Sequence, residues 1–163
     1  MDNALIKNWN SVVKDNDIIF NLGDFAFAPN WRWEELINIL KGKHLLIVGN
    51  HDTSRYPGDH IMSLFERVEN QMMLDIDGRK VYLNHYPFLC YADTYRDNED
   101  KRTIQLYGHV HSGPYKKGYD INRLQCCFAE QYDVGVDNNN YYPINYNDVL
   151  IKIKERRYAY EHI

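Results

Sequence analysis

The chain has 163 residues, a net charge of −4, and 44% hydrophobic and 26% charged residues. This length suits one domain with a sizeable core, and the negative balance argues against a general nucleic-acid-binding surface, which would be basic. No apolar run is long enough to span a membrane and no apolar signal region opens the chain, so a cytoplasmic protein is expected. Cys90, Cys126 and Cys127 lack metal-type spacing. They are predicted to be buried, reduced side chains.

The first half of the chain alternates helical and strand-like patterns. Residues 2–14 have one apolar face, formed by Leu5, Ile6, Trp9, Val12 and Val13, and predict a helix. A strand is expected over 18–22, a second helix over 31–41 and a second strand over 44–48. We therefore expect helices and apolar strands to follow one another here, with the strands ending in short loops.

The second half contains mostly strand-like segments. A short helix is predicted over 61–68, and strands over 71–76 and 80–85 are expected to form a hairpin at Asp77-Gly78. Residues 91–103 read as a polar surface loop of the kind that often carries binding function, and 104–107 as a strand. Strands are also predicted over 124–128, 132–136 and 149–154, with 156–162 extending or pairing with the last.

Polar motifs follow several of the predicted strands. They are Gly23-Asp24, the GNHD run at 49–52, His85 in LNHYP, and the GHVH run at 108–111. Ligands bind at the carboxyl ends of strands in open α/β sheets. Alone, GNHD could be a polar turn, Asp24 a helix cap and His85 a structural residue. Together they indicate a metal site, because these side chains are costly to bury without partners.

The donor types limit the metal that such a site would take. One carboxylate, one amide oxygen and several imidazoles suit Mn²⁺, Fe, Zn²⁺ or Ni²⁺ and not Ca²⁺. His109 and His111 are two positions apart, so in an extended chain both imidazoles would face one site while Val110 faces away.

The motifs, in this order, resemble those of the calcineurin-like metallophosphoesterases, over about residues 2–150. The resemblance implies an α+β fold, a β-sandwich flanked by helices in four αββα layers. The family begins with an Asp-x-His at the end of its first strand, and no Asp-x-His precedes Gly23 here. We therefore expect residues 1–163 to be a single, N-terminally shortened domain without that strand. Residues 18–22 would then form a sheet edge, with self-association or marginal stability as consequences. Alternatively, the natural protein is longer.

The resemblance also implies a role for each motif residue. Asp24 would bridge two metal ions, Asn50, His85 and His109 would complete one metal site, and His111 would bind the other ion. His51 would protonate the leaving oxygen, and Asp52 could orient the His51 imidazole. The implied function is hydrolysis of a small phosphoester or nucleotide-like substrate, expected to be a phosphodiester, by metal-activated water. Two ions are expected for the family and one well-bound ion here. The alternative is a metal-binding protein of the same fold with little or no hydrolytic activity.

Overall fold

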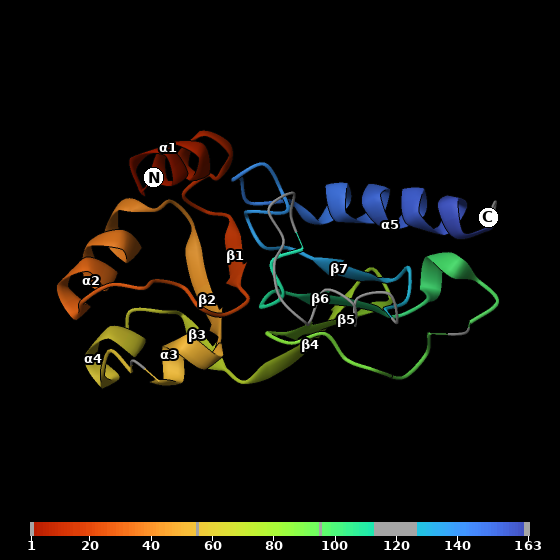
Figure 1. The fold of residues 1–163 in the computed structure, drawn as a ribbon, viewed down its shortest axis with the longest axis horizontal. Coiled ribbons are helices and arrows are strands. Elements are labelled where there is room, and N and C mark those ends of the chain that lie inside the picture. Colours follow the sequence, from red (N-terminus) through yellow and green to blue (C-terminus); the bar gives the residue numbers. More distant parts are fainter. Residues whose placement is uncertain (1, 55, 95, 113–126, 162–163) are drawn as a thin grey trace.

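Two β-sheets form the centre of the structure (Figure 1). The computed structural model describes residues 2–54, 56–94, 96–112 and 127–161. The smaller sheet is parallel, in the order β1 (Ile18–Asn21), β2 (Lys43–Ile47) and β3 (Arg67–Glu69). The larger sheet has the order β4 (Gln71–Ile76), β5 (Arg79–Asn84), β6 (Ile104–Tyr107) and β7 (Gln131–Asp133). Its β4–β5 pair is antiparallel, and its other two pairs are parallel.

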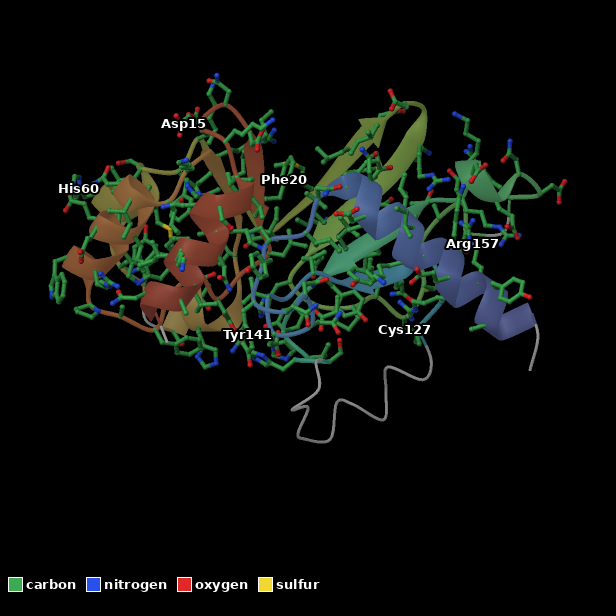
Figure 2. The ribbon with its side chains drawn as sticks, turned by 90° about the horizontal axis from the view of Figure 1, so that it is seen from above. Asp15, Phe20, His60, Cys127, Tyr141 and Arg157 are labelled. Atoms are coloured by element: carbon green, nitrogen blue, oxygen red, sulfur yellow. The ribbon has the colours of Figure 1, made fainter. Side chains whose placement is uncertain are left out.

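Helices lie against both sheets. They are α1 (Asp2–Val12), α2 (Asn30–Ile39), α3 (Asn50–Ser54), α4 (Asp59–Met62) and α5 (Tyr146–Glu161), with a 3₁₀ turn η1 (Glu99–Lys101). Figure 2 shows α1 over the smaller sheet and α5 over the larger one, on the same side of the molecule. In the described part of the chain, no helix combines the length and apolar character needed to cross a membrane.

Adjacent residues of β2 point to two different apolar clusters, as the period of a strand requires. Leu46 is fully buried in a cluster with Trp33 of α2 and Ile61 of α4. Ile47 is fully buried in a second cluster, whose other buried members come from the residue after β1, the larger sheet and α5. They are Leu22, Val81, Leu83, Ile104, Tyr132, Val149 and Ile153. The smaller sheet is thus packed between helices and the larger sheet. The predicted α+β class, with two sheets flanked by helices, is confirmed.

Most predicted elements of the first 107 residues are present. The hairpin of β4 and β5 turns at Asp77-Gly78, and β1 lies at the edge of its sheet, where the described residues pair it with β2 alone. The helix predicted over 61–68 is wrong beyond Met62, because Val68 belongs to β3 and pairs with Leu46. Residues 50–52, expected in a loop, begin the short helix α3.

The strand predicted over 149–154 is wrong, because these residues lie within α5. Val149, Ile153 and Arg157 are buried and four residues apart, so they share one helix face. Val149 and Ile153 enter the cluster shared with the sheets, and Nε of Arg157 lies 3.0 Å from Oε1 of the buried Glu130. The apolar–polar alternation of this segment therefore concealed a helical period.

Two further predictions differ from the structure near the cysteines. Of the strand predicted over 124–128, residues 124–126 lie outside the described residues, and Cys127 and Phe128 are not in a strand. Cys90 is exposed rather than buried, and Cys127 is intermediate. Cys126 lies outside the described residues.

Candidate metal centre

The candidate site lies where two pairs of parallel strands end, β1 with β2 and β5 with β6. Leu22, Gly23 and Asp24 follow β1, and Gly49 and α3 follow β2. His85 directly follows β5, and Gly108-His109 directly follows β6. The two sheets therefore bring the four sequence motifs to one place, although residues 24 and 109 are far apart in the chain.

His85 is buried, with 1% of its surface exposed. Its Nδ1 lies 2.7 Å from the carbonyl oxygen of Leu22. A carbonyl can only accept, so Nδ1 carries the proton and, in the neutral ring, Nε2 presents a lone pair. Metal-binding histidines are commonly held by such a second hydrogen bond.

The lone pair of His85 Nε2 faces other electron-rich atoms. Oδ1 of Asn50 is 3.0 Å away and Oδ2 of Asp24 is 3.4 Å away. With the proton on Nδ1 these three atoms are all acceptors, and a cation between them would satisfy their lone pairs. The donor set therefore fits a metal ion.

His109 completes this group. Ligand atoms of Asp24, His85 and His109 all lie within 4.8 Å of one another. Two ligands on opposite sides of one ion, each about 2.0–2.3 Å from it, would be separated by at most about 4.6 Å. Small side-chain movements would therefore let all three bind one ion, with Asn50 as a fourth ligand. This arrangement is compatible with the metal site implied by the resemblance.

Glycine is required at two positions because the chains approach so closely here. Gly23 has φ = +93°, and a Cβ on it would lie 2.3 Å from Nδ1 of His85. A Cβ on Gly49 would lie 2.3 Å from Oδ1 of Asp24. Each glycine thus leaves the space in which a predicted ligand sits, so the Gly-Asp and Gly-Asn pairs have a steric reason beyond turn formation.

Asp52 does not have the predicted contact with the His51 ring. Its carboxylate is 1% exposed and accepts hydrogen bonds from three backbone N–H groups among the described residues, those of Gly49, Asp24 and Phe25, at 2.8, 2.8 and 3.0 Å. The prediction that Asp52 orients the imidazole is therefore replaced by another role. The Asp52 carboxylate links the loop after β1 to the loop after β2 through these hydrogen bonds, which places Asp24 beside Asn50.

His51 lies next to the group of predicted ligands. Its backbone N–H donates a 2.8 Å hydrogen bond to Oδ1 of Asp24, while Oδ2 of the same carboxylate faces His85. The centroid of the His51 ring is 4.5 Å from that of Phe27. The His51 backbone thus contacts a predicted ligand, while among the described residues its imidazole does not belong to the group around His85.

The backbone around His111 differs from the extended chain that was expected, and its role as a ligand of a second ion stays a prediction. The chain leaves the extended conformation after β6, and His109 and His111 have φ values of +66° and +45°. The two imidazoles therefore do not follow the alternation of a strand, although Val110 is buried as expected. Among the described residues, the group compatible with one metal ion contains His109 and not His111.

Two aspartates that were not among the predicted site residues hold the His111 loop. Nδ1 of His111 lies 3.1 Å from Oδ2 of Asp137, and the His111 side chain is 72% exposed. The buried Asp133 accepts hydrogen bonds from the backbone N–H and the hydroxyl of Ser112, at 3.0 and 2.5 Å. Asp137 ends the Gly135-Val136-Asp137 segment, which resembles a strand end of the family. Asp133 had no such signal.

Comparison with known proteins identifies the family of the chain. The profile of the calcineurin-like phosphoesterase superfamily domain matches residues 2–123, so the chain belongs to this family. An uncharacterized protein of Methanocaldococcus jannaschii is 30% identical over 158 residues, which cover 96% of this chain and 76% of that protein. The crystal structure of a protein of unknown function from Aquifex aeolicus is similar in fold, with a TM-score of 0.65 and 22% identity over 92% of this chain and 83% of that one.

Proposed function

We propose that this chain is a metal-dependent phosphoesterase that hydrolyses a phosphodiester. The observation that carries the proposal is the meeting of His85 Nε2 with the oxygens of Asn50 and Asp24, at 3.0 and 3.4 Å, in a member of a phosphoesterase family. Asp24, Asn50, His85 and His109 would hold the ion. Manganese, iron, zinc and nickel are the metals that this donor set favours.

The residues of the chain would divide the work in a simple way. When bound, a divalent metal supplies the positive charge that polarises the phosphoryl group and activates water. Leu22, through its carbonyl, keeps the proton of His85 on Nδ1 and so keeps Nε2 available. His51 would give a proton to the leaving oxygen, since its backbone N–H bonds to Asp24 while its ring is outside the ligand group.

Metal content and hydrolysis of bis(p-nitrophenyl) phosphate test the proposal together. The purified protein should retain a transition metal and should release p-nitrophenolate, and it should lose both properties in His85→Ala. His60→Ala is the matched control, because His60 is an exposed histidine on α4 and should change neither result. Protein without bound metal after reconstitution, or activity equal in His85→Ala, would refute the assignment.

A second candidate function has one observation in its favour. His111 is turned toward Asp137 and lies outside the group around His85, so the described residues assemble ligands for one ion. A protein with one ion could bind metal and hydrolyse little. Metal retention without turnover on aryl, alkyl and nucleotide diesters would select this alternative. We further propose one domain for the chain, because both sheets contribute to the same apolar cluster.

A further inference from the structure

An exposed aromatic ring stands beside the residue that would protonate the leaving group. The side chain of Phe27 is 58% exposed, and its ring centroid is 4.5 Å from that of His51, with the planes tilted by 54°. Exposed apolar side chains are common on protein surfaces and need no explanation when scattered. Phe27 differs because its contact is with the candidate site.

The loop that carries Phe27 is fixed on both sides of it. The Phe25 N–H bonds to Asp52, and the Phe25 ring packs against Trp33 and Phe65. Ala26 and Ala28 pack against the same buried cluster. The neighbours of Phe27 thus point into the protein while its own ring remains at the surface. A ring held in this way costs little further conformational entropy when a ligand covers it.

The position of His51 determines which part of a substrate would reach Phe27. A general acid must lie within hydrogen-bond reach of the oxygen that it protonates. The leaving alcohol would therefore lie next to the His51 ring and hence next to Phe27. Aromatic side chains favour flat partners, which they bind by stacking or by edge-to-face contact.

We infer that Phe27 is a specificity residue that binds a planar aromatic ring on the leaving alcohol of the substrate. Nucleosides and aryl alcohols share this chemistry. The inference rests on the proposed function, because it takes His51 as the proton donor. It adds a direction to the reaction: of the two ester bonds in an asymmetric diester, the bond to the alcohol that carries the ring is the one broken. Water adds to phosphorus, and that alcohol leaves with the proton from His51.

The methyl ester of adenosine monophosphate tests this direction within one molecule. Cleavage in the inferred sense releases adenosine and methyl phosphate, whereas the opposite cleavage releases methanol and adenosine monophosphate. We expect adenosine to predominate with the metal-loaded wild-type protein. In Phe27→Leu, which keeps apolar bulk and removes the ring, the product ratio should fall about 2- to 12-fold, the range for one aromatic contact. Phe27→Tyr should preserve the ratio, and so should Tyr158→Leu, which removes an exposed aromatic ring from α5.

Methyl phenyl phosphate provides the second arm. A loss of kcat/KM in Phe27→Leu for both diesters supports a general aromatic subsite, and a loss for one identifies the nucleoside or the aryl alcohol as its ligand. A ratio near one in the wild type, or no effect of Phe27→Leu on either diester, overturns the inference. If the wild type cleaves neither diester, the proposed function fails. The aromatic subsite can then be tested without turnover, by calorimetric measurement of the affinities for phenyl phosphate and for methyl phosphate. Equal affinities for the two ligands, in the wild type and in Phe27→Leu, overturn the inference. A preference of the wild type for phenyl phosphate that is lost in Phe27→Leu supports it.

Discussion

The backbone N–H of Asp24 donates a 2.8 Å hydrogen bond to the buried carboxylate of Asp52. The same Asp52 oxygen accepts a second 2.8 Å bond from the Gly49 N–H. One carboxylate oxygen thus joins the chain after β1 to the chain after β2. The position of Asp24 relative to Asn50 depends on this bridge, so Asp52 acts on the site through the backbone rather than through the His51 ring.

Asp52→Asn should therefore weaken folding. The amide has one oxygen where the carboxylate has two. In the variant its NH₂ group would therefore face a backbone N–H that donates to a carboxylate oxygen in the wild type. We expect the free energy of unfolding to fall by about 1–3 kcal/mol, the cost of leaving a buried donor unsatisfied. Urea denaturation measures it, with Asp15→Asn as the control because Asp15 is exposed. Unchanged stability with an altered pH profile of hydrolysis would instead support a role in orienting His51.

His51→Ala should separate proton donation from metal binding. The His51 backbone N–H that bonds to Asp24 is retained in the variant, so Asp24 should keep its orientation. We expect unchanged metal content and a loss of turnover of about 10²–10⁴-fold, the range for general acid–base catalysis. Metal analysis and steady-state kinetics on the same preparation measure both. Loss of metal from His51→Ala would reassign His51 as a ligand.

Metal binding should be asymmetric. One position can use Asp24, Asn50, His85 and His109, whereas a second position would have Asp24 and His111, and His111 faces Asp137. Calorimetric titration of metal-free protein with Mn²⁺ or Zn²⁺ should show one tight site. His85→Ala should abolish that site and His111→Ala should leave it intact. Two tight sites of equal affinity would contradict the prediction and would require ligands from elsewhere.

Protonation of His44 should lower the free energy of unfolding in mild acid. The His44 side chain is buried on β2, where it stacks on Trp9. Burial lowers the pKa of His44 from its ordinary value, and this outweighs the hydrogen bond to the Leu40 carbonyl, which acts to raise the pKa. The folded protein therefore binds this proton less readily than the unfolded chain. The stability is fully present above the unfolded pKa, about 6.5, and is lost as the pH falls through the lower folded pKa.

A pH series of urea denaturation curves measures this effect. Below about pH 6.5 the wild type should lose unfolding free energy more steeply than His44→Gln, which cannot titrate. His60→Gln is the control, because the His60 side chain is 74% exposed. Equal slopes for wild type and His44→Gln would show that His44 does not contribute.

Sequence alone was sufficient for the strands that carry the site. Residues 18–22, 44–48, 80–85 and 104–107 are short apolar runs, and each is followed by a motif with Asp, Asn or His. Polar motifs at the ends of such strands are where ligands bind in open α/β sheets, so the sequence indicates a site, whereas the packing of the two sheets brings the two pairs of motifs together. The order of these motifs carried the resemblance to the family, and that resemblance in turn implied the grouping of Asp24, Asn50, His85 and His109.

Tertiary structure alone decided three other features. Residues 149–154 alternate like a strand but form part of α5, because burying Val149 and Ile153 together against the two sheets requires the spacing of a helix. His111 turns toward Asp137 because the chain leaves the strand with positive φ values, which no apolar pattern records. Asp52 bonds to backbone N–H groups of another loop. In each case the deciding partner is distant in the chain, and local residue patterns carry no information about contacts that only folding creates.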